Sequence, residues 1–439
     1  MRGRRVLLVN PWIYDFAAYD LWAKPLGLLY LGSLLRRNGC EVELLDCLAG
    51  EQPRPKPGGH GKFRREIIEK PAALKDVPRH YARYGMRVEA FQARLSRMER
   101  PDVVLVTSLM TYWYPGVFEA IRRSKSAFPD SPVVLGGIYA TLCHAHARSF
   151  SGADYVIAGE GEIEVLKLLS GLWGVTPEFV PDMADLDALD YPCFDLVQAL
   201  RYVCIQTSRG CPLQCTYCAA HLLSHGLRRR SPEKVVEELA FWNRRGVQDF
   251  AFSDDALLFE PEGFALPLLR DLMRRDHAVH FHCPNGLHVR SISQEVARSM
   301  KAAGFVTIRL GLETTWPERQ AATGAKVTNA EFREAVENLG RAGYTAEDIG
   351  VYLLCGLPHQ GADEVRSAID LVKACGATPI LAEYSPIPGT GLWEEAVKSS
   401  PFPISAEPLY QNNSILPCRW EGLTYEMYQD LRRRMKSNP

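Results

Sequence analysis

The chain has 439 residues, of which 46% are hydrophobic and 23% are charged, and 51 basic residues balance 52 acidic ones to a net charge of −1. These proportions are those of a globular protein long enough for two or three domains. The near-neutral charge provides no basic field for nucleic acid, so we expect no nucleic-acid partner. The longest apolar segment, residues 25–35, is too short to span a bilayer.

The cysteines and the first residues of the chain bear on its compartment. Most of the 12 cysteines are isolated in the sequence, as expected for small buried hydrophobic residues rather than for a disulfide framework. The apolar run at 6–9, which follows a basic start, is too short for the core of a signal peptide. We therefore expect a cytoplasmic protein.

The first part of the chain alternates apolar strands with helices. Strands are predicted at 6–10, 41–46, 103–107, 133–135 and 154–158, and helical spacing recurs over 26–35, near 115–124 and up to residue 169. Continuous apolar strands separated by helices favour a parallel, doubly wound (Rossmann-like) sheet, whose ligands bind beyond the carboxyl ends of the strands. We assign this domain to residues 1–176.

An insertion at about 49–100 interrupts the alternation. It begins with a loop rich in proline and glycine at 53–61 and continues with mixed polar sequence. Because a structureless connection of this length is uncommon in a compact domain, we expect it to carry local helix and to cover a site.

A linker rich in Asp and Pro is predicted at 177–198, and a second α/β domain follows at 199–390. Its strands are predicted near 203–207, 248–253, 278–283, 305–310, 348–354 and 379–384, each followed by a helix except the last. Six strands of this kind predict a partial (β/α)6 barrel, in which chemistry gathers at the carboxyl ends of the strands. The C-terminal extension, 391–439, is expected to close the barrel or to border the substrate.

The motif that carries the chemistry is Cys211-x3-Cys215-x2-Cys218, directly after the first strand of the second domain. Three thiolates on one loop can hold three corners of a cubic iron–sulfur cluster and leave the fourth iron without a protein ligand. Clusters that only carry electrons are usually closed by four cysteines. A metal site that is one ligand short is open to a substrate or cosubstrate.

A structural zinc site is the alternative for these cysteines. Paired cysteines such as Cys215 and Cys218 are common in zinc sites, but a second Cys or His pair at a suitable spacing is then expected. The next cysteine, Cys283, has no neighbouring cysteine, whereas His221 and His225 follow the motif closely. Zinc therefore stays open on the sequence alone.

The motif resembles the signature of the radical S-adenosylmethionine (SAM) superfamily, which it matches at Gly210, Cys211, Pro212, Cys215, Tyr217 and Cys218. The resemblance implies a 4Fe-4S cluster bound by the three cysteines. It also implies that the amino and carboxylate groups of SAM chelate the open iron. An electron from the cluster then cleaves SAM to a 5′-deoxyadenosyl radical, which removes an unactivated hydrogen.

The resemblance also implies a SAM site built at successive strand ends. It assigns Ser253 and Asp254 to the aminoacyl end of SAM, Asn285 and Glu313 to polar groups of SAM or substrate, and the remaining SAM contacts to Tyr217 and Leu357. Asp255 is a second candidate for the ammonium group of SAM, and it is equally suited to capping a helix.

The first domain resembles the cobalamin-binding domain of one branch of this superfamily. The resemblance implies cobalamin contacts at Pro25, Leu26, Gly27, Ser108, Gly136, Gly137, Ile138, Gly159, Glu160 and Gly161. Glycine at strand ends lets a large ring approach the backbone, although such a domain could equally hold a nucleotide or no ligand. The Asp-x-His-x-x-Gly motif that supplies a cobalt ligand in many cobalamin enzymes is absent, so no axial ligand is named.

The resemblance thus implies a cobalamin-dependent radical SAM enzyme that methylates an unactivated carbon. Its expected partners are a small-molecule, lipid or natural-product substrate and an external one-electron donor such as flavodoxin or ferredoxin. The sequence names no catalytic residue beyond the cofactor ligands. Radical rearrangement, cyclisation or oxidation is the alternative outcome. A non-catalytic cobalamin or iron–sulfur sensor is the alternative from another class.

Overall fold

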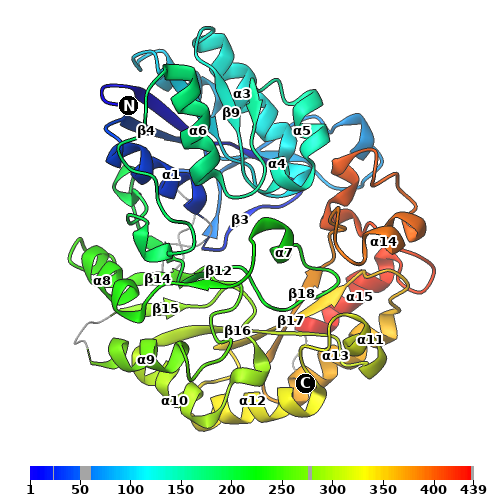
Figure 1. Cartoon of the computed structure of the whole chain (residues 1–439). Helices are drawn as coiled ribbons and strands as arrows, with labels where there is room; N and C mark the ends of the chain where they lie inside the picture. Colours follow the sequence, from blue (N-terminus) through cyan, green and yellow to red (C-terminus); the bar gives the residue numbers. More distant parts are fainter. Residues whose placement is uncertain (23, 50–60, 275–278, 437–439) are drawn as a thin grey trace. The chain divides into compact units, whose positions relative to one another are not determined.

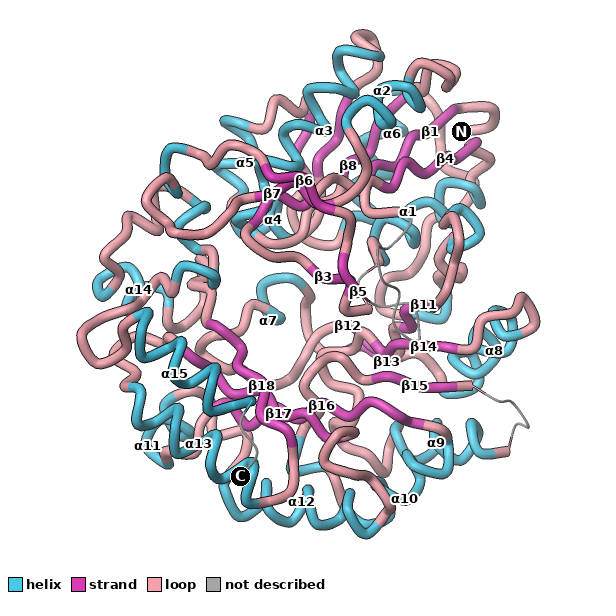
Figure 2. Tube along the Cα trace, turned by 180° about the vertical axis from the view of Figure 1, so that it is seen from behind, coloured by secondary structure: helices cyan, strands magenta, loops and turns pink. Residues whose placement is uncertain are grey.

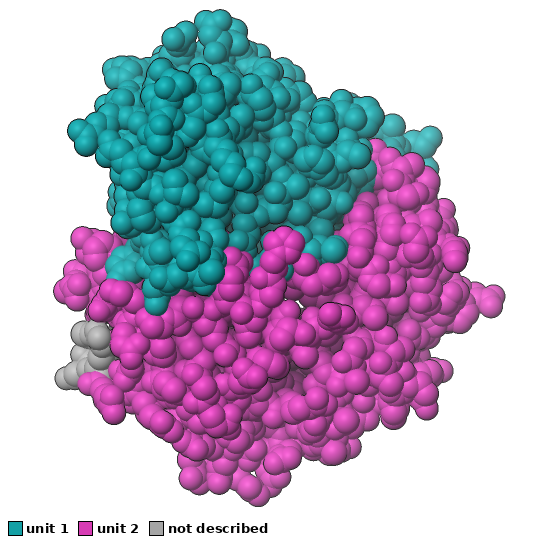
Figure 3. Space-filling model, viewed as in Figure 1, with its two compact units in different colours: residues 1–201, 222–224, 408–410 teal, residues 202–221, 225–407, 411–439 magenta. Residues whose placement is uncertain are grey.

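The computed structural model describes residues 1–22, 24–49, 61–274 and 279–436. The chain forms two compact units (Figure 3), the first made of residues 1–201, 222–224 and 408–410 and the second of residues 202–221, 225–407 and 411–439. The predicted linker at 177–198 lies within the first unit, where it contains the short 3-10 helices η4 (Leu186–Ala188) and η5 (Phe194–Leu196). Most of the proline- and glycine-rich loop predicted at 53–61 lies outside the described residues.

The first unit is built on a five-stranded parallel sheet in the order β10-β9-β8-β1-β4. Its strands are β1 (Arg5–Asn10), β4 (Glu41–Asp46), β8 (Val103–Val106), β9 (Val133–Leu135) and β10 (Tyr155–Val156). Its helices are α1 (Leu26–Arg37), α2 (Val88–Leu95), α3 (Tyr114–Ala127), α4 (Ile138–Leu142), α5 (His144–Phe150) and α6 (Gly161–Trp173). The order of the strands reverses between β1 and β8, and ligands of such sheets bind at the carboxyl ends near this point.

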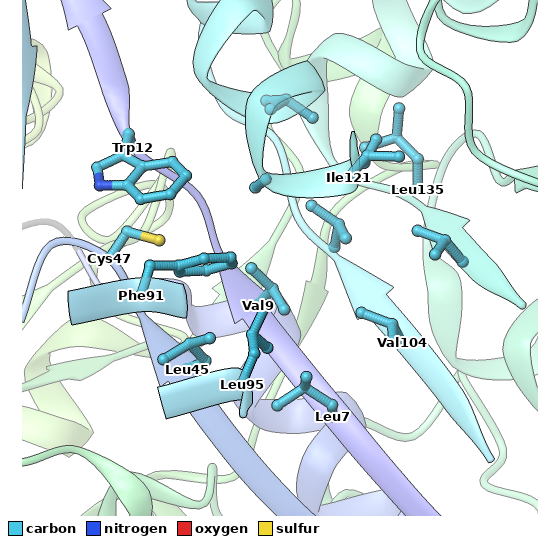
Figure 4. Packing of buried hydrophobic residues seen from close by; sticks show 14 of the residues in the cluster. Leu7, Val9, Trp12, Leu45, Cys47, Phe91, Leu95, Val104, Ile121 and Leu135 are labelled. Carbon is cyan, nitrogen blue, oxygen red and sulfur yellow. The ribbon is translucent and has the colours of Figure 1, made fainter. Parts of the chain in front are cut away.

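The two faces of this sheet are covered by different helices. On one face, Leu7 and Val9 of β1 pack with Phe91 of α2 and Ile121 of α3 in a buried cluster (Figure 4). Leu8, between them in sequence, points to the other face, where Gly32 of α1 lies against it. Burial on both faces explains why the strands are continuous apolar runs.

The insertion contributes the helix α2 and the strands β5 (Gly61–Lys62), β6 (Arg65–Ile67) and β7 (Ala82–Tyr84), which form two small antiparallel sheets with β2 (Ile13–Asp15) and β3 (Tyr19–Asp20) from the segment after β1. One sheet pairs β2, β7 and β6, and the other pairs β3 with β5. Both follow the carboxyl ends of β1 and β4 in the chain, and a 3-10 helix, η2 (Ala72–Leu74), lies between β6 and β7.

The second unit is a six-stranded parallel sheet whose spatial order, β11-β14-β15-β16-β17-β18, follows the sequence (Figure 1). The strands are β11 (Tyr202–Ile205), β14 (Asp249–Phe252), β15 (His280–His282), β16 (Phe305–Glu313), β17 (Ile349–Cys355) and β18 (Thr378–Glu383). Among the described residues β11 and β18 pair with no further strand beyond these neighbours, so the barrel is open. The predicted fold class, a doubly wound domain followed by a partial barrel, is confirmed.

Helices line one side of this sheet along its whole width (Figure 2). They are α8 (Pro232–Asn243), α9 (Ala265–Met273), α10 (Gln294–Ala303), α12 (Asn329–Arg341) and α13 (Ala362–Ala374). Shorter helices are α7 (Ala220–Leu223), α11 (Pro317–Ala322) and α14 (Trp393–Ser399), and the last helix, α15 (Tyr425–Lys436), contacts α13 and β18. The remaining short elements are the hairpin strands β12 (Ser208–Arg209) and β13 (Arg228–Arg229) and the 3-10 helices η3 (Thr111–Trp113), η6 (Val289–Ser291), η7 (Pro408–Gln411) and η8 (Asn413–Ile415).

No helix within the described parts of the chain is both long enough and apolar enough to cross a membrane.

Candidate active site

The three-cysteine loop follows β11, and the two chain segments at its base approach closely at Gly210 and Gly226. Ser208 and Arg209 of β12 pair with Arg229 and Arg228 of β13, so these two segments form a two-stranded antiparallel hairpin. Gly210 has a φ of +85°, and a Cβ there would overlap the carbonyl oxygen of Gly226. Only glycine fits both the left-handed backbone and this close approach.

The centre of the loop is held by Cys215, which is only 8% exposed. Gly324, at the end of the α11 segment, has a φ of +117°, and a Cβ on it would lie 3.1 Å from the Cα of Cys215. The backbone N–H of Cys218 donates to the Cys215 carbonyl at 3.0 Å, and the N–H of Ala220 donates to the Cys218 thiol at 3.5 Å. These contacts fix the backbone of the loop around Cys215.

The three thiols of the loop are close enough for their charges to act on one another. Burial raises the pKa of Cys211 and of Cys218, and negative charge on Asp255 and on the neighbouring cysteines raises both further. A cationic metal centre would relieve this repulsion, because thiolate is the form that binds metal. In the part of the chain that the structure describes, no group of three His, Cys, Asp or Glu side chains is arranged to share one metal ion. Three thiols on one short loop fit a cubic cluster, in which each thiolate binds a different iron.

Two polar side chains lie at this loop. Tyr217, within the loop, has a hydroxyl whose pKa is raised by burial, by the carboxylate of Glu313 and by a hydrogen bond with Cys215. His288 lies beside the loop: its Nε2 is 3.9 Å from the Cys211 sulfur, and its buried Nδ1 has no hydrogen-bond partner among the described residues. Burial lowers the pKa of His288 to about 4, so the imidazole is neutral at physiological pH. Orphaned polar atoms of this kind are expected where a ligand completes the site.

Glu313 forms an ion pair with Lys326 in the same region. Burial alone would lower the pKa of Lys326, but the Glu313 carboxylate and the Cys215 and Cys218 thiols outweigh burial and raise it. Gly311 leaves room for the pair, because a Cβ there would lie 2.7 Å from the Lys326 ammonium. Glu313 itself has a φ of +68°, a strained backbone of the kind that gathers at functional sites.

Asp254 and Asp255, which adjoin in sequence, have different environments. Asp254 is 4% exposed, and its Oδ1 accepts hydrogen bonds from the backbone N–H and the hydroxyl of both Thr207 and Ser208. Its carboxylate is thus occupied by the turn that precedes the cysteine loop. Asp255 keeps more contact with solvent, although the surrounding protein still raises its pKa, and its charge acts on Cys211 and Cys218.

The other predicted SAM residues lie at the expected strand ends. Ser253 follows β14, and its N–H donates to the Ile205 carbonyl at 2.8 Å. Asn285 is exposed, and its amide donates to the Asp254 carbonyl at 3.1 Å. Leu357 follows β17 and is only 1% exposed, so it packs beneath the surface of the site. Their contact with SAM stays a prediction.

The first unit gathers its own group of predicted ligand residues around Ser108, which follows β8. The Ser108 hydroxyl donates to the Gly136 carbonyl at 2.7 Å, and its carbonyl accepts from the N–H of Ile138 at 2.8 Å. Gly137, with a φ of +94°, has no room for a Cβ because the Ser108 backbone lies against it. The ends of β8 and β9 therefore form one ledge of backbone.

Thr141, which no pattern in the sequence marks, extends this ledge. Its hydroxyl donates to the Gly137 carbonyl at 2.8 Å and accepts from the N–H of Gly159 at 2.9 Å. Glu160 then caps α6, and a Cβ on Gly27 or Gly159 would meet no atom within 4 Å. Pro25 and Leu26 form the start of α1, and Gly161 forms the start of α6. An edge with few side chains and open space above Gly27 and Gly159 fits a large flat ligand.

These features define an iron–sulfur enzyme with an open barrel and an added doubly wound domain. Residues 205–372 match the Radical SAM superfamily, and residues 78–169 match the B12 binding domain. The chain belongs to the radical SAM superfamily, in the branch that carries a cobalamin-binding domain. It is an enzyme of this class, and its cofactors are a 4Fe-4S cluster, SAM and cobalamin.

Proteins of known name and structure are similar over most of the chain. An uncharacterised methyltransferase of Pyrococcus horikoshii is 24% identical, with 91% of this chain and 81% of the relative covered. The cytidylyl-2-hydroxyethylphosphonate methyltransferase of Streptomyces wedmorensis is 23% identical, with 96% and 88% covered. The solved structure of the radical SAM methyltransferase TsrM from Kitasatospora setae has the same fold, with a TM-score of 0.66, 19% identity, and 90% and 76% of the two chains covered.

Proposed function

We propose that this protein methylates an unactivated carbon of a small-molecule substrate. The observation that carries the proposal is the placement of Cys211, Cys215 and Cys218 on one loop, shortly after β11 and within the residues that match the Radical SAM superfamily. The names of the two relatives, both methyltransferases, favour methyl transfer over the other outcomes of radical chemistry. When bound, the cluster and SAM supply a carbon-centred radical and cobalamin supplies a methyl group.

The roles of the protein's own residues follow from their positions. The three cysteines hold the cluster and leave one iron open. Asp255, the acid whose charge acts on the cysteine loop, holds the ammonium group of SAM, whereas Asp254 fixes the turn that presents the loop. Ser253, Asn285, Tyr217 and Glu313 supply the remaining polar contacts, with Leu357 beneath them. The ledge formed by Ser108, Gly136, Gly137, Ile138 and Gly159, together with residues 25–27 and 160–161, receives the corrin.

A dedicated electron donor, a flavodoxin or a ferredoxin, and a reducing cytoplasm complete the proposal. A cluster with an open iron is sensitive to oxygen, and the 12 cysteines are all free thiols in the structure.

The test is anaerobic reconstitution with iron and sulfide, followed by reduction in the presence of SAM and hydroxocobalamin. We expect a brown protein that forms 5′-deoxyadenosine and transfers a labelled methyl group from SAM to cobalamin. Cys215→Ala should abolish both activities. Cys375→Ala, at the end of α13 and outside the motif, is the matched control and should keep them.

Each other outcome would favour an alternative function of the protein. A protein that binds cobalamin and the cluster but never cleaves SAM is a sensor. SAM cleavage without methyl transfer to cobalamin would favour rearrangement, cyclisation or oxidation. Retained cleavage in Cys215→Ala would contradict the assignment of the cluster ligands.

A further inference from the structure

A cavity of about 610 Å³ lies in the first unit, between the insertion and the loop after β2. Its walls are the loop after β2, the run from β5 to β6, and the end of β7. Tyr19 of β3 pairs with Lys62 of β5, and Arg65 of β6 pairs with Tyr84 of β7, so both small sheets contribute lining residues. None of the ten residues predicted to contact cobalamin lines it.

The lining is strongly cationic. Lys62, Arg64, Arg65 and Arg79 line the cavity, and no Asp or Glu is among the described lining residues. Within the described chain, Lys62, Arg64 and Arg65 form no ion pair with a carboxylate, whereas the nearby Arg83 is paired with Glu66. Three unneutralised cations around one cavity repel one another, and this repulsion is relieved when an anion binds.

The apolar part of the lining is aromatic and held in place. Phe63 and Tyr84 belong to a small buried cluster, and the Tyr84 hydroxyl donates to the Phe16 carbonyl at 3.1 Å. The Asp15 carboxylate accepts from the N–H of Phe16 at 2.6 Å and from the indole of Trp113 at 2.7 Å, which fixes the loop after β2. Arg79 lies over the Phe16 ring at 5.3 Å. These contacts hold the aromatic wall in a fixed position, and a fixed wall lowers the entropic cost of binding.

We propose that this cavity binds an organic phosphate, a molecule that joins a phosphoryl group to an aromatic or apolar body. A phosphate monoester carries nearly two negative charges at neutral pH and three acceptor oxygens, so it neutralises this group of cations better than a single carboxylate. Arginine forks match phosphate oxygens in two parallel hydrogen bonds. The aromatic wall provides a face on which the body of the ligand stacks. The proposal concerns residues of the first unit and does not depend on the radical chemistry proposed above.

The test is calorimetric titration of the full-length protein with phenyl phosphate, without SAM, reductant or added cobalamin. We expect saturable binding by the wild type that weakens as salt is added. The triple variant K62Q/R64Q/R65Q should bind at least about tenfold more weakly. The control K75Q/R87Q/R97Q removes the same charge from exposed positions of the same unit outside the cavity and should bind like the wild type.

Because the binding assay needs neither cluster nor SAM, its result is independent of the methyl-transfer proposal. The single variant R65Q, at an exposed position, serves if the triple variant does not fold, and it should also weaken binding. Absence of saturable binding, or an equal loss in the control, overturns the proposal. If inorganic phosphate binds as tightly as phenyl phosphate, the proposal that the ligand is an organic phosphate is wrong. If hydroxocobalamin displaces phenyl phosphate, the cavity belongs to the cofactor instead.

Discussion

Thr207 donates two hydrogen bonds to Oδ1 of Asp254, one from its backbone N–H at 3.0 Å and one from its hydroxyl at 2.7 Å. Thr207 follows β11 and Asp254 follows β14, and these strands are neighbours in the sheet. With two further bonds from Ser208, the carboxylate ties together two strand ends immediately before the cysteine loop.

Asp254→Asn should therefore destabilise the fold. The amide replaces one acceptor oxygen with a donor, whereas the backbone N–H groups and hydroxyls of Thr207 and Ser208 all donate to this carboxylate. Leaving buried groups unsatisfied costs about 1–3 kcal/mol. Urea unfolding of the full-length protein, with Asp255→Asn as the matched control, measures the difference. A variant as stable as the wild type would show that the amide is accommodated by rotation of the side chain.

The pKa of the Asp254 carboxyl predicts that its contribution to the free energy of unfolding falls as pH rises. Burial raises the pKa of Asp254 from 3.8 to about 6, even though its hydrogen bonds act in the opposite direction. Between these pH values the folded state binds more protons than the unfolded state, so the Asp254 contribution to stability falls as pH rises. The stability advantage of the wild type over Asp254→Asn should shrink by about 1–2 kcal/mol between pH 4.5 and 6.5. An advantage that grows over this range would show that the hydrogen bonds outweigh burial.

Asp255→Asn is expected to act on SAM rather than on stability. Its charge already acts on Cys211 and Cys218, and loss of a charge-assisted bond to an ammonium group costs about 1.5–3 kcal/mol, or about tenfold or more in affinity. Equilibrium dialysis of SAM against the reconstituted protein measures the change, while iron content reports that the cluster is intact. Unchanged SAM affinity would assign the ammonium group to another residue.

The different environments of Asp254 and Asp255 could not be predicted from the sequence. Both follow the same predicted strand and both are carboxylates, so spacing cannot tell which side chain folds under the turn and which faces the cysteines. The strands themselves were predictable because burial on both faces leaves continuous apolar runs, and the cysteine motif was predictable because its ligands lie on one loop. The boundaries differ by a few residues, as in β16, which continues to Glu313 through an irregular register.

His288 and Lys326 were missed for a related reason. They lie 77 and 115 residues after Cys211 in the sequence, and only the assembled barrel brings them to the cysteine loop. His288 follows Asn285 after β15, so its place near a strand end was a signal, although a weak one. Lys326 follows a helix rather than a strand, and no local pattern marks it.

Gly324→Ala should impair cluster assembly. The residue has a φ of +117°, and its Cβ would lie 3.1 Å from the Cα of Cys215 and 3.6 Å from its sulfur. We expect a loss of stability of about 1–2 kcal/mol from the backbone alone and a lower iron content after reconstitution. Gly340→Ala, on α12 with no atom within 4 Å, is the control and should be neutral or stabilising. Full iron loading of Gly324→Ala would show that Cys215 shifts without losing its place in the cluster.

Gly137→Ala tests the ledge at the end of β8 and β9. Gly137 has a φ of +94°, and a Cβ there would lie 2.7 Å from the Ser108 nitrogen, so the substitution must push apart the two loops that Ser108 and Thr141 join. We expect hydroxocobalamin, followed by its visible absorbance after gel filtration, to bind at least about tenfold more weakly. Gly171→Ala, within α6 and without neighbouring atoms, should bind it like the wild type. Because the iron–sulfur centre belongs to the other unit, Gly137→Ala should still form 5′-deoxyadenosine from SAM. Tight corrin binding by Gly137→Ala would place the ligand elsewhere in the first unit, and loss of SAM cleavage as well would indicate general misfolding rather than a local defect.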